Sequence, residues 1–140
     1  MTSDPTTPQI DGVTSGNASG EIARQGWFVG HFMGEGHPLR TDGVEVKWSV
    51  YEGGERRAGW GANREATTLC VLVRGRFRLS FPGGDVWLER EGDFVQWLPN
   101  VPHEWQADGP TIVLSVRWPS VPGDSYPVPP PSGREEPEPR

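Results

Sequence analysis

A single histidine, His103, closes a stretch whose residue types could support acid–base or metal chemistry. The stretch reads GDFVQWLPNVPHEW over residues 92–105, with an acid and a tryptophan directly after the histidine. An imidazole with a pKa near neutrality suits general acid–base work, and a neutral imidazole can also bind a metal ion. Because side chains alternate along a strand, Glu104 would face away from His103. The acids that could orient His103 from other strands are Glu45, Glu65 and Asp93.

Two further polar side chains with chemical potential lie on expected strands. Arg117 lies between Val116 and Trp118 near the end of the last strand. It either pairs with Glu45 across the sheet or enters the interior, where its guanidinium would suit a carboxylate. Cys70 lies in mid-strand, where a buried thiol without a neighbouring cation is usually inert. As the only cysteine, it excludes an internal disulfide and a cysteine-rich zinc site.

The elements that carry these residues read as short strands separated by glycine and proline turns, which is typical of an all-β sandwich or barrel. In the first strand, Val46, Trp48 and Val50 share the face that we expect to be buried. Glu45 and Lys47 share the opposite face, which we expect to be solvated. The segment GWFVGHFM either opens the barrel as a strand or follows a short helix. The expected strands cover 44–51, 67–75, 76–81, 86–90, 94–98, 103–107 and 111–118.

Composition limits the chain to one domain. It has 140 residues, a formal net charge of −6, 34% hydrophobic residues, 19 glycines and 15 prolines. We expect a disordered segment at 1–20, a folded domain at 21–118 and a proline-rich disordered tail at 119–140. The acidic balance argues against nucleic acid and anionic membrane surfaces as partners. The sequence has no apolar run of membrane length and no secretory signal, which favours a cytoplasmic protein.

The stretch from Gly92 to His103 resembles the second motif of the cupin superfamily. In that motif, a glycine is followed by five residues, a proline, any residue, a glycine, two residues and a histidine. The two ends match, whereas Leu98 and Asn100 replace the inner proline and glycine. Asparagine tolerates the left-handed backbone conformation that a turn requires, so the turn can be kept.

The first cupin motif ends in a glycine that Gly75 matches, directly after the strand TTLCVLV. The resemblance covers roughly 45–118 and implies an all-β fold, a small antiparallel jelly-roll barrel of cupin type. It also implies a possible homodimer formed through sheet edges. The strand at 44–48 would be such an edge, and Lys47 would protect it in a monomer.

The metal site that the resemblance would imply lacks three of its four ligands. Metal-binding cupins carry two histidines and a glutamate in the first motif, and this sequence has Ala62, Arg64 and Thr68 at those positions. One imidazole does not hold a divalent cation, which needs three or more protein ligands. We therefore expect no metal and no other cofactor. The side chains that could restore a site with His103 are His31, His37 and Glu65.

If the strands follow the cupin register, the barrel interior is aromatic with a few polar groups. Thr68, Cys70 and Leu72 would point inward together, as would His103 and Trp105. Such residues either pack as a core or line a small-molecule pocket, which is usually apolar with few polar groups. The predicted catalytic residue is His103, and the predicted ligand-binding residues are Trp48, Trp60, Arg64, Thr68, Cys70, Trp97, Trp105 and Arg117.

Three functions are consistent with these residues. The first is a cupin-like barrel that binds a small organic molecule in an aromatic-lined cavity without a conventional metal site. The second is an enzyme on the same barrel: an isomerase, epimerase or cyclase that uses His103, or a metal oxygenase with displaced ligands. The third is an interaction protein whose tail, with the sequence PVPPP, recruits a partner.

Overall fold

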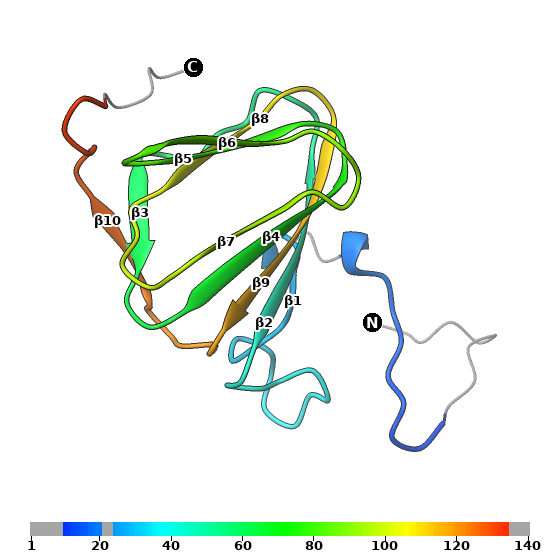
Figure 1. Ribbon diagram of the computed structural model, residues 1–140. Coiled ribbons are helices and arrows are strands. Elements are labelled where there is room, and N and C mark those ends of the chain that lie inside the picture. The colour runs from blue at the N-terminus through cyan, green and yellow to red at the C-terminus, as the bar shows by residue number, and fades with distance from the viewer. Residues whose placement is uncertain (1–9, 21–23, 135–140) are drawn as a thin grey trace.

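The computed structural model describes residues 10–20 and 24–134, and their strands form a barrel of antiparallel sheets (Figure 1). After a short 3-10 helix, η1 (Ala18–Gly20), the strands are β1 (Trp27–Val29), β2 (Glu45–Tyr51), β3 (Trp60–Asn63), β4 (Thr67–Arg74), β5 (Phe77–Phe81), β6 (Gly84–Leu88), β7 (Phe94–Trp97), β8 (Glu104–Ala107), β9 (Thr111–Trp118) and β10 (Ser125–Val128). One sheet has the order β1-β2-β9-β4-β7, and the facing sheet has the order β6-β5-β8. The pair β10-β3 closes one side. Among the described residues, no helix has the length and apolar character needed to cross a membrane.

Glycine and asparagine make the turns that the sequence predicts for the two motifs. Gly75 has a φ of +98°, and a side chain there would meet the carbonyl oxygen of Pro110. Gly92 and Asn100 have φ values of 91° and 67°. Both lie in the left-handed region, so Asn100 takes the conformation expected of a residue that replaces glycine.

Strand β2 presents its polar face to the barrel interior. Glu45 and Ser49 are only 7% and 5% exposed, whereas Val50 is 56% exposed. Lys47 lines the interior as well. The prediction that the apolar face of 44–50 is the buried one is therefore wrong. Alternation shows which residues share a face but does not show which face points inward. Glu45 has polar partners here, since Arg117 and Ser120 both donate to its carboxylate.

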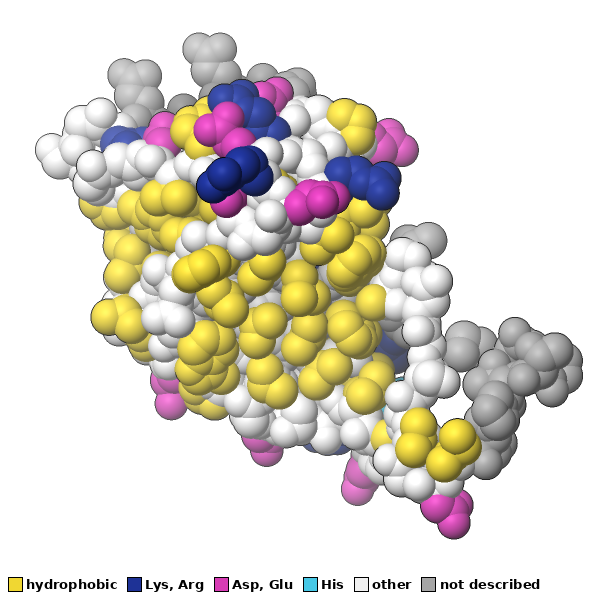
Figure 2. All heavy atoms as spheres, turned by 45° about the vertical axis from the view of Figure 1, so that its right-hand side comes forward, with side chains coloured by type: hydrophobic (Ala, Val, Ile, Leu, Met, Phe, Trp, Pro, Cys, Tyr) yellow, Lys and Arg dark blue, Asp and Glu magenta, His cyan; other side chains and the backbone are white. Residues whose placement is uncertain are grey.

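The outer face of the five-stranded sheet is apolar and exposed, which explains the misleading pattern. Figure 2 shows hydrophobic side chains gathered over one side of the molecule. Besides Val50, the exposed side chains include Phe94 at 68%, Leu98 at 61% and Trp118 at 38%. Because apolar residues lie on both faces of this sheet, hydrophobicity alone does not identify its interior.

The strand predicted to be a dimerisation edge lies inside the sheet. Strand β2 pairs with β9 over its whole length and with β1 through Val46 and Lys47. Lys47 therefore faces the interior instead of protecting an edge. The homodimer itself stays a prediction.

Part of the proline-rich segment belongs to the barrel. Strand β10 pairs with β3, with Ser125 opposite Asn63 and Val128 opposite Trp60. Just before it, the Asp124 carboxylate accepts hydrogen bonds from the backbone amides that follow β3, at 2.8 and 3.1 Å. A proline is tolerated in β10 because the strand is at an edge. The sequence places 119–140 outside the domain, whereas the structure brings residues 124–128 into it. Residues 1–9, 21–23 and 135–140 lie outside the described residues.

Candidate functional site

A largely enclosed cavity of about 50 Å³ lies inside the barrel. Side chains from both sheets and from the loop before β3 surround it. Its lining residues are Lys47, Tyr51, Arg57, Thr68, Cys70, Phe77, Leu79, Trp97, His103, Trp105, Ser115 and Arg117. The structure thus brings together six of the predicted site residues, which are Thr68, Cys70, Trp97, His103, Trp105 and Arg117.

The strand register places three of these residues in one row across the large sheet. Arg117 on β9 is opposite Thr68 on β4, and Thr68 is opposite Trp97 on β7. Each has a buried polar atom, namely Arg117 Nε, Thr68 Oγ1 and Trp97 Nε1, with no hydrogen-bond partner among the described residues. Leaving a buried polar group unpaired costs roughly 1–3 kcal/mol, so such groups are rare. Three residues that line one cavity thus each carry an unpaired polar atom.

The next row of the same sheet holds Lys47, Ser115 and Cys70. Cys70 Sγ lies 3.3 Å from Ser115 Oγ. Burial raises the pKa of the Cys70 thiol, so the reactive thiolate is disfavoured at neutral pH. Cys70 therefore contributes a neutral polar surface and not a nucleophile.

His103 enters the cavity as a neutral imidazole. Its Nδ1 lies 3.0 Å from the carbonyl oxygen of Val101. A carbonyl only accepts, so Nδ1 carries the hydrogen and Nε2 is left as an acceptor. Burial, followed by the charges of Arg57 and Arg117, lowers the pKa of His103 to about 4, although the Val101 hydrogen bond opposes this. The expectation of a pKa near neutrality is therefore wrong, because the site is both buried and cationic.

None of the three acids considered as partners of His103 takes that role. Glu45 is paired with Arg117, whose Nη1 lies 3.3 Å from a Glu45 oxygen. Asp93 accepts hydrogen bonds from two backbone amides of its own turn, at 3.0 and 2.9 Å. Glu65 is exposed. The backbone carbonyl that holds Nδ1 orients the ring instead.

Arg57 is a cavity residue that the sequence analysis does not identify. Its Nη1 donates to the carbonyl oxygen of Gly59 at 2.9 Å. Its guanidinium lies against Gly61 so closely that a side chain at that position would overlap it. Gly61 in turn pairs with His103 through two backbone hydrogen bonds. Because Arg57 lies in the irregular loop before β3, no strand periodicity indicates that it faces the cavity.

Aromatic rings form one wall of the cavity. Tyr51 and Trp105 lie with ring centroids 4.8 Å apart, and Phe77 lies 5.5 Å from Trp105. The Trp97 ring is 4.7 Å from that of His103. Burial raises the pKa of Tyr51 to about 12, so its phenol stays protonated at neutral pH. Sequence reasoning also missed Tyr51, Lys47 and Ser115. They line the cavity because they lie on the faces of β2 and β9 that point into the barrel.

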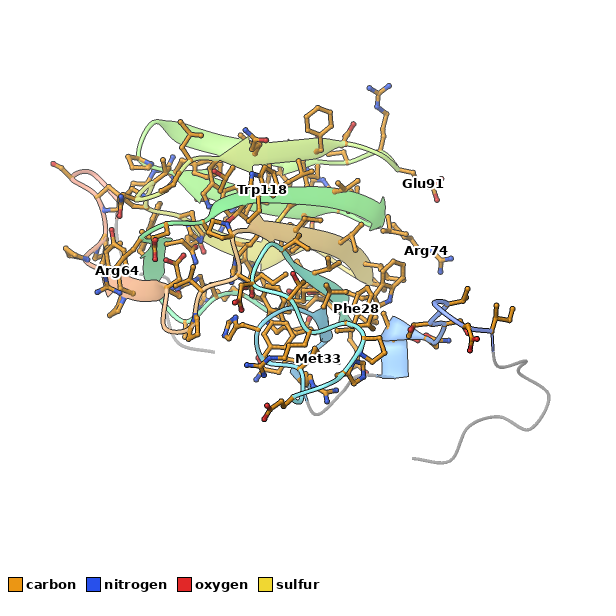
Figure 3. The ribbon with its side chains drawn as sticks, turned by 90° about the horizontal axis from the view of Figure 1, so that it is seen from below. Phe28, Met33, Arg64, Arg74, Glu91 and Trp118 are labelled. Atoms are coloured by element: carbon orange, nitrogen blue, oxygen red, sulfur yellow. The ribbon has the colours of Figure 1, made fainter. Side chains whose placement is uncertain are left out.

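Three predicted ligand-binding residues lie outside the cavity. Trp48 borders a neighbouring groove of about 420 Å³, which shares Lys47, Tyr51 and Trp105 with the cavity. Trp60 is buried at 3% exposure in β3 and lines a separate groove. Arg64 is exposed, and its guanidinium lies 4.6 Å from the ring centroid of Tyr126. Figure 3 shows Arg64 beside β10, at the edge of the barrel.

The residues at the metal positions of the motif do not fit a divalent cation. Ala62 and Thr68 are buried, and Arg64 points away. The histidines that could have helped are used elsewhere: His31 Nδ1 lies 2.6 Å from Ser120 Oγ, and His37 Nδ1 accepts a backbone hydrogen bond. Among the described residues, no group of three His, Cys, Asp or Glu side chains is placed to hold a metal ion.

Comparison with known proteins rests on structure. No family model matches the sequence, and no curated protein matches it. The structure is similar to a cupin protein from Bacteroides fragilis (TM-score 0.52, 16% identity, 61% of this chain and 74% of that one). It is also similar to the DMSP lyase DddQ from Ruegeria pomeroyi (TM-score 0.57, 19% identity, 72% and 50%) and to Streptomyces PAC13 with uridine (TM-score 0.54, 16% identity, 63% and 69%). At such identities, the likeness concerns the fold alone.

Proposed function

We propose that this chain, which has the fold of the cupin superfamily, binds a small organic molecule inside its barrel without using a metal ion. The observation that carries the proposal is the row formed by Arg117, Thr68 and Trp97. All three line the cavity, and each keeps a buried polar atom without a partner in the described part of the chain. A ligand with hydrogen-bonding groups would pair with these atoms and offset the cost of their burial.

The composition of the cavity supports the same function. Small-molecule sites are mostly apolar with a few placed polar groups. Tyr51, Phe77 and Trp105 provide a stacked aromatic wall. His103 Nε2 adds one acceptor, since Nδ1 is held by Val101. The uridine in the PAC13 structure and the lyase activity in the name of DddQ indicate that similar barrels accommodate small molecules.

The other two functions have less support. An isomerase, epimerase or cyclase that uses His103 as an acid would need a protonated imidazole, yet burial and then the nearby arginine charges lower the pKa of His103 to about 4. At neutral pH, the ring can only act as a weak base or as an acceptor. An interaction protein would need a free tail, whereas 125–128 form β10 in the barrel.

A panel of small organic molecules of different charge tests the proposal. We expect at least one compound to raise the melting temperature and to change the tryptophan fluorescence. The matched variants are Thr68→Val, which removes the hydroxyl in the cavity, and Thr67→Val, which removes the neighbouring hydroxyl on the other face of β4. T68V should weaken binding and T67V should not. The absence of any response across the panel, or equal responses of the two variants, would contradict the proposal.

A further inference from the structure

The barrel cavity is strongly cationic. Of its twelve lining residues, Lys47, Arg57 and Arg117 carry positive charge and none carries a carboxyl group. The fourth titratable side chain that could carry positive charge, His103, is neutral near pH 7 because burial, followed by the nearby arginine charges, lowers its pKa to about 4. Buried charges are normally paired, since an unpaired charge is costly to remove from water. The three cations around this small cavity are half-buried, so a compensating anion would stabilise them.

Within residues 10–20 and 24–134, an ion pair neutralises only one of these cations. Arg117 is paired with Glu45 at 3.3 Å, and Glu45 does not line the cavity. In the described residues, none of the ion pairs involves Lys47 or Arg57. The Trp27 ring lies 5.6 Å from Lys47 Nζ and 4.9 Å from the Arg117 guanidinium, which stabilises both cations without neutralising them.

The cations lie close enough to repel one another. Burial lowers the pKa values of Lys47 and Arg57, and the positive charge of Arg117 lowers both further, although the charge of Glu104 opposes this at Arg57. Like charges in a buried site disfavour each other, and a bound anion would relieve this repulsion. The arrangement is imposed by the fold: Lys47 faces inward from β2, and Arg57 is folded across Gly61.

The hydrogen-bonding groups around the cavity are mostly donors, so they favour a ligand that carries acceptors. Trp97 Nε1 and Arg117 Nε, both unpaired in the described structure, are donors only. Lys47 and Arg57 add charged donors. The lining offers few acceptors, notably Nε2 of His103 and the hydroxyl groups. A ligand rich in acceptors and poor in donors fits this set better than an amine or an amide.

The size and the surface of the cavity restrict the class of ligand further. A cavity of about 50 Å³ holds roughly three to five water-sized groups. This is enough for a carboxylate with a short carbon chain. The rings of Trp97 and Trp105 give such a chain an apolar surface, which an inorganic anion could not use.

We propose that the molecule bound in the barrel is a small organic carboxylate, held by Lys47, Arg57 and Arg117. The inference rests on the proposed binding function and names its ligand class. The carboxylate lies between the two unpaired cations, with the Arg117 Nε–H and Trp97 Nε1–H groups as further donors. Its carbon chain packs against the tryptophan rings.

Isothermal titration calorimetry with paired probes tests this ligand class. Propionate and propionamide have nearly the same shape but differ in charge, and inorganic phosphate is a third arm. We expect propionate to bind at least about tenfold more tightly than propionamide, because it forms charge-assisted hydrogen bonds. Equal binding of the pair, or binding of phosphate without propionate, would overturn the inference. This arm uses the wild-type protein and does not depend on any variant that must fold.

Two neighbouring arginines provide the matched variants. Arg57→Gln removes a cavity cation, whereas Arg56→Gln removes the charge of a residue that lines a different groove. R57Q and Lys47→Met should each weaken propionate binding about tenfold or more, and R56Q should leave it unchanged within about twofold. Equal loss in R56Q and R57Q would contradict a specific site.

Failure of this inference is distinguishable from failure of the proposed function. A neutral or cationic compound of the panel could bind, with weaker binding in T68V, while propionate does not bind. The cavity would then be a binding site for a different class of ligand. If no compound of any charge binds, the binding function itself is wrong.

Discussion

The guanidinium of Arg57 occupies the space that a side chain on Gly61 would need. Gly61 lies on β3 and pairs through its backbone with His103, the residue directly before β8. The absence of a side chain at one position thus allows a loop arginine to reach the same cavity as the histidine. This contact joins the glycine of β3, the cation of the preceding loop and the imidazole into one site.

Gly61→Ala should displace Arg57 from the cavity. Because the added methyl group overlaps the guanidinium, the arginine must move, and carboxylate binding should weaken as it does in R57Q. Gly83→Ala is the control, since a side chain there meets no atom within 4 Å. Calorimetric titration with propionate compares the two variants, with circular dichroism as a check of folding. Unchanged affinity in G61A would show that Arg57 does not contact the ligand.

The buried His103 should make the fold sensitive to mild acid. Burial and then the arginine charges lower its folded pKa to about 4, against an ordinary value of 6.5. The unfolded state therefore takes up the proton first as the pH falls. The stabilisation provided by the neutral ring is complete above about pH 6.5 and is lost progressively towards pH 4. The contribution lost is of the order of 2–3 kcal/mol.

Urea unfolding of the wild type and of His103→Gln over this pH range measures the effect. The wild type should lose stability more steeply than H103Q as the pH falls. His37→Gln serves as the control because His37 is exposed, and its slope should match that of the wild type. Identical slopes in the wild type and H103Q would mean that the ring titrates normally.

Cys70 should be unreactive in the folded protein. Its side chain is 5% exposed, and burial raises the pKa of the thiol. Reaction with a chromogenic disulfide reagent should be at least about 100-fold slower in the native state than in denaturant. Rapid modification under native conditions would contradict the inward orientation of β4 at this position.

Asp124 should stabilise the closure of the barrel by β10. Its carboxylate is 7% exposed and accepts two backbone hydrogen bonds, from Glu65 and Ala66. Asp124→Ala should lower the free energy of unfolding by about 1–3 kcal/mol, because one buried and one partly buried amide lose their acceptor. Glu91→Ala, at an exposed turn position, should change it little. Equal stability of D124A and E91A would mean that β10 does not contribute to the cooperative unfolding of the barrel.

Much of the barrel can be predicted from sequence because its turns depend on local chemistry. Gly75, Gly92 and Asn100 have the positive φ values that their types favour. The register implied by the cupin resemblance also predicts correctly that Thr68 and Cys70 face inward. The cupin resemblance therefore predicts which side chains of β4 face the barrel interior.

The cationic half of the cavity could not be predicted in the same way. Lys47 belongs to a strand with one polar and one apolar face. The polar face points inward, and this orientation is determined by the closed barrel and not by the strand itself. Arg57 reaches the site from an irregular loop, where no periodicity applies. Proline content identifies 119–140 as irregular, but cannot show that part of it pairs with β3.

The chemical shifts of the tryptophan indole N–H groups test the central claim most directly. In a two-dimensional nitrogen–proton spectrum recorded during titration with propionate, the signals of Trp97 and Trp105 should move. The signals of Trp87 and Trp118, which are 39% and 38% exposed outside the cavity, should not. If neither propionate nor any other compound of the panel moves the Trp97 and Trp105 signals, the barrel interior is only a packed core and the binding function is refuted.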